Sequence, residues 1–198
     1  MRVKNKILLI ILLVLVFNLF QLNIICAKQN NPERSYLLNT TWDQEGEYAK
    51  YTPDHWRLGC WSVAIAQILY YHRLQPHGYA SYKCSTGYTI KEELNYNFNW
   101  NLFVNQLNAD IPAKSKDEVA KYIYFGSVVL QKDFGTNTYV EDGNPHWLDE
   151  HYNCINNEYD TFKYSLDEIK SIIIKEIDSK RPVILYLQSL TGLRCSGY

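Results

Sequence analysis

The sequence lacks any cluster of basic residues interleaved with aromatic ones, so it offers no surface of the kind that binds nucleic acid. Its 20 lysine and arginine residues are nearly balanced by 21 aspartate and glutamate residues, and the formal net charge is −1. It also contains no internal repeat, no low-complexity tract and no linker. These absences favour one compact domain whose partners are not nucleic acids.

Cysteine is sparse, with five residues in 198. Cys26 lies in the apolar N-terminal segment, and the other four are Cys60, Cys84, Cys154 and Cys195. In an oxidising compartment these four could form two disulfides, in any of three pairings. Four cysteines are few for a domain held together by disulfides, although a disulfide-linked structural domain remains one alternative.

A long apolar run occurs near the N-terminus, from Ile7 to Phe17, and three basic residues precede it: Arg2, Lys4 and Lys6. A basic start, an apolar middle and a small residue at the cleavage point are typical of a secretory signal peptide. We therefore expect residues 1–27 to be removed and residues 28–198 to be secreted, without stable membrane association. The alternative is a membrane anchor formed by an uncleaved signal, but the segment is interrupted by Asn18, Gln21 and Asn23.

The segment Cys60–Arg73 predicts a helix in the core of the domain. Apolar residues occur on almost every side of it: Val63, Ile65, Ala66, Ile68 and Leu69. We expect it to be the most buried helix, packed beneath an apolar, β-branched strand at Arg181–Gln188.

Three further helices are predicted from local signals. The first has apolar residues on one face, the second starts at a proline, and the third starts at a serine–glutamate capping box. Their expected ranges are Asp117–Leu130, Pro145–His151 and Ser165–Asp178. Residues 79–115 show no clear periodicity. Helices early in the chain and a strand late in it indicate an α+β domain.

The position of Cys60 suits a nucleophile. A cysteine attacks as the thiolate, and a helix N-terminus stabilises that anion through its dipole and its unpaired backbone N–H groups. The preceding Gly59 allows a sharp turn and would leave room for a substrate backbone beside the sulfur. A buried structural cysteine is the alternative, because a Gly-Cys pair before a helix is a weak motif.

The surrounding residues strengthen the interpretation as a nucleophile. The stretches "TTWDQEGEYAKYTP" and "GCWSVAIAQILYYHRLQPHG" closely resemble the start of the mature domain in the streptopain family of secreted cysteine peptidases. In that family a W-x-Q segment precedes a G-C-x-x-x-A-x-A-Q-I helix, which ends in Y-H and a proline-glycine turn. The matching residues here are Trp42, Gln44, Gly59, Cys60, Ala64, Ala66, Gln67, Ile68, Tyr71, His72, Pro76 and Gly78. Weaker similarity covers most of residues 40–192.

The resemblance implies a papain-like fold and the hydrolysis of peptide bonds, with a polypeptide substrate and no cofactor. Cys60 would be the nucleophile. Gly192 matches the glycine just before the family's catalytic histidine and would lie at the substrate cleft. Gln44 is a candidate for binding the oxyanion, with a loop amide that satisfies backbone groups as the alternative. The oligomeric state is not predicted.

The chain departs from the family immediately after Gly192. Leu193 stands where the catalytic histidine should be, and the family's later strands are missing. Among the other histidines, His72 lies about 18 Å along the helix from Cys60, and His55 has no counterpart in the family. We therefore expect the N-terminal portion of a streptopain-like domain, incomplete in its C-terminal β part and inactive by itself, through truncation or a frameshift. The alternative function is a non-catalytic secreted binding protein.

One group of residues has a spacing that a metal could use. It consists of His146, His151 and Cys154. Since no fourth ligand is evident, we expect no metal site.

Overall fold

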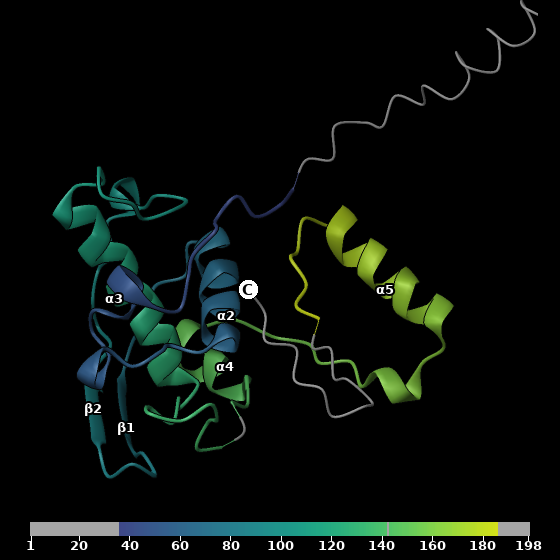
Figure 1. Cartoon of the computed structure of the whole chain (residues 1–198). Coiled ribbons are helices and arrows are strands. Elements are labelled where there is room, and N and C mark those ends of the chain that lie inside the picture. The colour runs from purple at the N-terminus through teal and green to yellow at the C-terminus, as the bar shows by residue number, and fades with distance from the viewer. Residues whose placement is uncertain (1–35, 142, 186–198) are drawn as a thin grey trace, which may run out of the picture. The chain divides into compact units, whose positions relative to one another are not determined.

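The computed structural model describes residues 36–141 and 143–185. The chain divides into two units, Met1–Tyr36 and Leu37–Tyr198, and the following description concerns the second (Figure 1). The predicted signal peptide, Gly192 and Leu193 lie outside the described residues. None of the described helices has the length and apolar composition needed to cross a bilayer.

Two helices form the centre of the described fold. Helix α2 spans Cys60–Tyr71 and helix α3 spans Ala113–Val129, so α3 begins four residues before the predicted Asp117. The earlier start follows from the good helix formers directly after Pro112, the N-cap residue. Gly126 of α3 faces Ala66 of α2, and a Cβ added at Gly126 would stand 3.5 Å from the Ala66 Cβ. The two small residues let the helices approach closely at this crossing.

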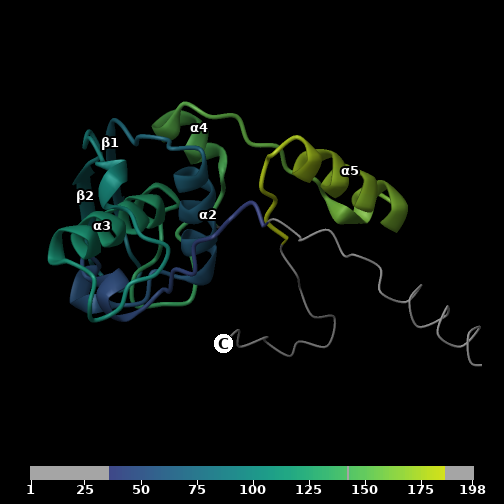
Figure 2. The ribbon, with the colours of Figure 1, turned by 90° about the horizontal axis from the view of Figure 1, so that it is seen from above.

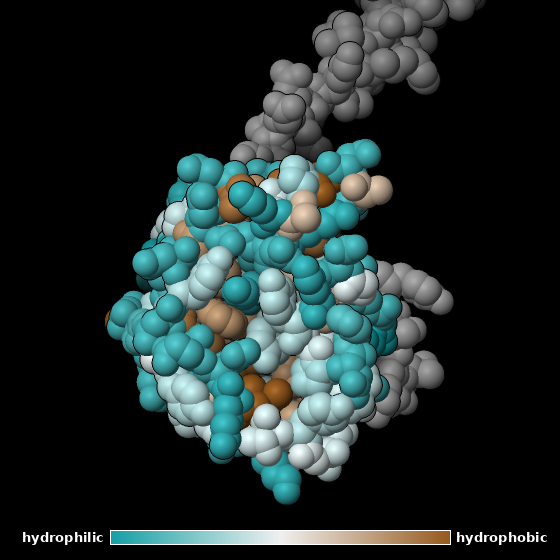
Figure 3. Space-filling model, turned by 90° about the vertical axis from the view of Figure 1, so that its left-hand side faces the viewer, coloured by the Kyte–Doolittle hydropathy of each residue, from teal (hydrophilic) through white to brown (hydrophobic). Residues whose placement is uncertain are grey.

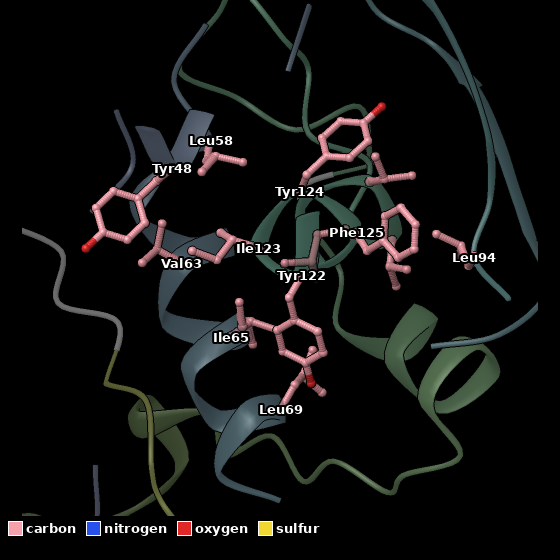
Figure 4. Packing of buried hydrophobic residues seen from close by; sticks show 14 of the residues in the cluster. Tyr48, Leu58, Val63, Ile65, Leu69, Leu94, Tyr122, Ile123, Tyr124 and Phe125 are labelled. Atoms are coloured by element: carbon pink, nitrogen blue, oxygen red, sulfur yellow. The ribbon is translucent and has the colours of Figure 1, made fainter. Parts of the chain in front are cut away.

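The most buried helix is α3 rather than α2, which corrects the prediction from the sequence. Twelve of the 17 residues of α3 are buried, against five of the 12 residues of α2. Figures 1 and 2 show the reason, because α3 lies between α2 and a β-hairpin and is covered on two sides. Figure 4 shows Ile123 beside Val63, Tyr122 beside Ile65 and Leu69, and Phe125 directed toward Leu94.

The hairpin consists of β1, Tyr79–Lys83, and β2, Thr89–Glu93, which pair antiparallel with Tyr82 opposite Ile90. The sequence did not predict it, because its inward-facing residues are few and include the small Ala80. Outward-facing residues of both strands are mainly polar. Seen from the side on which β2 lies in Figure 1, the surface is accordingly largely hydrophilic (Figure 3).

The remaining elements are short or lie late in the chain. The 3₁₀ helices are η1 Gly46–Ala49, η2 Pro53–His55, η3 Trp100–Leu102 and η4 Thr161–Lys163, and the later α-helices are α4 His146–Tyr152 and α5 Leu166–Asp178. Both later helices were predicted. The capping box at the start of α5 is present, with Ser165 Oγ accepting from the Glu168 N–H and the Glu168 carboxylate accepting from the Ser165 N–H.

The predicted strand Arg181–Gln188 is not found in its described part. Residues 181–185 have no strand assignment, and residues 186–188 lie outside the described residues. The sheet in the described part of the chain has two strands, β1 and β2, so residues 181–185 have no partner strand there. Residues 181–185 therefore form no strand for α2 to pack beneath, although Ile184 packs against the hydrophobic core.

Candidate active site

Cys60 is the first residue of α2, and its side chain is exposed. Gly59 is the N-cap, with φ +89°, and it provides no side-chain cap for the helix. Within the described residues, the N–H groups of Cys60 and Trp61 donate no hydrogen bond. The thiol thus lies at the open start of a helix, where unpaired N–H groups favour negative charge.

The position where a Cβ of Gly59 would stand is already filled. It lies 2.8 Å from the hydroxyl of Tyr139 and 3.1 Å from Cε of Lys132. The sharp turn expected at Gly59 is present, but this side of the turn is packed against protein atoms. The expected room for a substrate backbone is absent on that side.

The hydroxyl of Tyr139 caps the first turn of α2. It accepts a hydrogen bond from the Ser62 N–H at 3.1 Å and lies 3.0 Å from Ser62 Oγ. Further along the same segment, the carbonyl of Gly143 accepts a hydrogen bond from the Trp61 indole N–H at 3.1 Å. A segment about 80 residues away in sequence therefore supplies the cap that Gly59 cannot.

Lys132 lies behind this cap. Its side chain is 1% exposed, and Nζ donates to the carbonyls of Asp133, Thr136 and Thr138 at 3.0, 2.8 and 2.9 Å. Nζ also lies 5.3 Å from the centroid of the Tyr139 ring. Sequence reasoning missed both residues. The one local signal was the position of Lys132 between two large apolar residues, Leu130 and Phe134, which are both buried in the structure.

The thiol interacts electrostatically with both of these groups. Burial raises the pKa of Tyr139 to about 12, hydrogen bonds from Ser62 oppose the rise, and the charge of Cys60 adds to it. Burial lowers the pKa of Lys132, while the charges of Asp133, Cys84 and Cys60 raise it. Tyr139 therefore keeps its proton near neutral pH.

Gln44 is attached to the chain just before the thiol. Its carbonyl accepts a hydrogen bond from the Leu58 N–H at 3.0 Å, two residues before Cys60. The half-buried side-chain amide of Gln44 makes no hydrogen bond in the part of the chain that the structure describes. The alternative predicted role, a side-chain amide that satisfies backbone groups, is therefore not seen. Its role toward an oxyanion stays a prediction.

The model of the peptidase C10 family matches residues 42–196. The chain belongs to the peptidase C10 family, the streptopain family. The resemblance inferred from the residues around Trp42 and Cys60 is thereby confirmed.

The fold agrees with this C10 assignment. The chain is similar to the structure of a fragment of prointerpain A from Prevotella intermedia that carries a cysteine-to-alanine substitution. The TM-score is 0.67 at 18% sequence identity, and the match covers 74% of this chain and 52% of that one. The chain thus spans about half the length of this solved relative, and the predicted papain-like α+β fold is confirmed. A search of curated proteins finds no match.

No histidine in the described part of this C10 chain forms a hydrogen bond with Cys60. His55 is exposed and has a left-handed backbone, with φ +55°. His72 is the C-cap of α2, at the opposite end from the thiol. His77 lies beyond the end of α2 and pairs with His151: the His77 N–H donates to the His151 carbonyl at 2.9 Å, and His151 Nδ1 lies 3.0 Å from the His77 carbonyl.

The other described cysteines and the candidate metal ligands do not come together with Cys60 in one site. Cys84 is buried and Cys154 is half-buried, and neither forms a disulfide with Cys60. The thiol of Cys154 donates to the Leu148 carbonyl at 3.5 Å. Within residues 36–141 and 143–185, no three His, Cys, Asp or Glu side chains are arranged to hold a metal ion.

Proposed function

We propose that Cys60 is the nucleophile of cysteine peptidase chemistry and that its substrate is a polypeptide. The observation that carries the proposal is the exposed thiol at the first position of α2 in a chain of the C10 family. The thiolate would attack a peptide carbonyl carbon, the amine would leave, and water would release the acyl group. This chemistry requires no cofactor.

The backbone at the start of α2 supports stabilisation of the oxyanion. The N–H of Cys60 has no hydrogen-bond partner in the described residues, so it is free to donate to the oxygen of a tetrahedral intermediate. Gln44 is the second candidate donor, because its backbone is held two residues from the thiol. Gly192 would belong to the substrate cleft by its family position.

The proton acceptor is the part of this chemistry that the described residues do not supply. In the C10 pattern the histidine follows the glycine at Gly192, and this chain has Leu193 there. General acid–base help of this kind contributes typically about 10²–10⁴-fold. We therefore propose that this polypeptide by itself has a reactive thiol and little or no peptide turnover. Leu193 also favours a second candidate function, a non-catalytic binding protein derived from a peptidase.

We also propose that the protein is secreted by way of residues 1–27. The support is the basic start and apolar run of this segment and the relationship to a family of secreted peptidases. Membrane anchoring through an uncleaved signal is the alternative. Finding the N-terminus of the exported protein by sequencing distinguishes the two, because cleavage near Ala27 is expected.

Alkylation and proteolysis together test the role of Cys60. We expect iodoacetamide to modify Cys60 faster than Cys84 or Cys154, and we expect casein cleavage no faster than with the Cys60→Ala variant. Peptide mapping by mass spectrometry gives the alkylation rates. An alkylation rate at Cys60 no higher than at Cys154 contradicts the proposed nucleophile. Casein cleavage that depends on Cys60 contradicts the proposed lack of turnover and the binding function.

A further inference from the structure

Lys132 holds a buried positive charge that no carboxylate neutralises by direct contact in the described structure. All three of its N–H groups donate to backbone carbonyls, as described above. The nearest acidic side chain in sequence, Asp133, uses its carboxylate differently: it accepts from the N–H and the hydroxyl of Ser85, at 2.8 and 2.6 Å. Burying an ammonium is costly, so its place in the fold is strongly constrained.

The end of the aliphatic stem of Lys132, next to its ammonium, lies beside the backbone that precedes the thiol. Cε and Cδ of Lys132 lie 3.1 and 3.3 Å from the place where a Cβ of Gly59 would stand, and Gly59 is bonded to Cys60. The ring centroid of Tyr139 lies 5.3 Å from the Lys132 ammonium. The Tyr139 hydroxyl accepts a hydrogen bond from the Ser62 N–H, which is the third N–H group of the helix. Lys132 thus contacts both Gly59, in the turn before Cys60, and Tyr139, the residue that caps the first turn of α2.

We propose that Lys132 is a positioning residue for Cys60: its fixed positive charge stabilises the thiolate, and its hold on residues 133–139 keeps Tyr139 on the first turn of α2. The inference rests on the proposed role of Cys60 and extends it. In cysteine peptidases a histidine cation beside the thiol stabilises the thiolate. Lys132 supplies the charge but not the proton transfer, because its N–H groups are all bound to carbonyls. A reactive thiol without turnover follows from this arrangement.

The experiment compares two alkylating reagents on the full chain at one pH. Iodoacetamide is neutral and iodoacetate is an anion, so the ratio of their rates at Cys60 reports the local charge. The variant Lys132→Met removes the charge at similar length, and Lys132→Arg retains it. We expect Lys132→Met to slow alkylation of Cys60 about fivefold or more, and more for iodoacetate, and we expect Lys132→Arg to restore most of the rate. Cys154 serves as the internal reference and should be unchanged.

The outcomes separate this inference from the proposed function. If Cys60 of the wild type reacts no faster than Cys154, the proposed nucleophile fails. If Cys60 reacts faster but folded Lys132→Met leaves its rate unchanged, or slows both reagents equally, the role of the Lys132 charge is overturned. If Lys132→Met does not fold, the wild-type chain still decides. Its iodoacetate-to-iodoacetamide ratio at Cys60 should exceed that of N-acetylcysteine amide, and an equal ratio overturns the inference.

Discussion

At the scale of single residues, two separate constraints require glycine at position 59. Its φ of +89° is a conformation that residues with a Cβ rarely adopt, and a Cβ there would stand 2.8 Å from the Tyr139 hydroxyl. The second constraint matters more for function, since it lies at the contact between the turn before Cys60 and the cap on α2. Gly87 shares the first constraint without the second, because its φ is +96° and nothing lies within 4 Å of its Cβ position.

These two glycines give a matched pair of variants. Gly87→Ala should lower the free energy of unfolding by about 1–2 kcal/mol, the cost of a left-handed backbone for alanine. Gly59→Ala should lower it further, because the new methyl group must displace Tyr139 or Lys132. Urea unfolding measures both values. Equal losses in the two variants would show that the contact with Tyr139 carries no energetic weight.

How much of the site could be predicted differs sharply between residues. The start of the helix at Cys60 was predictable, because the glycine and the apolar run that follows are local signals. Lys132 and Tyr139 were not, because they contact the start of α2, at Gly59 and Ser62, from about 70 residues away in sequence. Gly192 belongs to the predicted site but lies outside the described residues.

At the scale of elements, the crossing of α2 and α3 depends on Gly126. The helix backbone there is ordinary, so glycine has only its conformational cost, and a Cβ would meet Ala66 at 3.5 Å, an ordinary van der Waals distance. Space for one methyl group exists, but space for a larger side chain does not. The crossing therefore sets an upper limit on residue size.

Substitutions at Gly126 should change stability in opposite directions. Gly126→Ala should raise the free energy of unfolding by about 0.4–1 kcal/mol, because alanine loses less conformational freedom on folding. Gly126→Leu should lower it by about 1–3 kcal/mol, because the larger side chain must separate the two helices. Thermal or urea unfolding distinguishes them. Destabilisation by alanine would mean that the helices are closer than the structure shows.

The elements that were predicted share one property, which is that their signals are local. The capping box at Ser165 and the proline before His146 were sufficient to place α5 and α4 within about one residue. The β1–β2 hairpin has weak alternation and depends on the packing of Tyr82 and Ile90 against the core. The apolar composition of residues 181–185 predicts a strand, but composition does not show whether a partner strand is present.

At the scale of the whole molecule, buried tyrosines dominate the response to alkaline pH. Burial raises the pKa of Tyr139 to about 12 and is also the largest cause of raised pKa values at seven more tyrosines: Tyr48, Tyr51, Tyr82, Tyr96, Tyr122, Tyr124 and Tyr152. The folded chain therefore keeps protons that the unfolded chain loses near pH 10. Lys132 acts in the opposite direction, since burial lowers its pKa, but it is one group against these eight tyrosines.

The free energy of unfolding should consequently be constant below about pH 9 with respect to these tyrosines and fall as the pH rises above about 10. Each tyrosine contributes a slope of about 1.4 kcal/mol per pH unit between its unfolded and folded pKa values. Urea unfolding at several pH values measures the slope, and Tyr139→Phe should reduce it by one such contribution. Phenolate absorbance should appear later in the folded chain than in urea. Coincident titrations of the folded and unfolded chains would refute the assignment.

The cap on α2 also has a consequence in time. Ser62 and its partner Tyr139 are 77 residues apart. At synthesis rates of about 5–20 residues per second, the chain is extended for about 4–15 s after Ser62 is made before Tyr139 exists. During that interval Cys60 has neither its cap nor the cation behind it, and its thiol should behave like that of a short peptide. The thiol thus acquires its special environment late, only after the segment that carries Lys132 and Tyr139 has been made and has packed onto the helix.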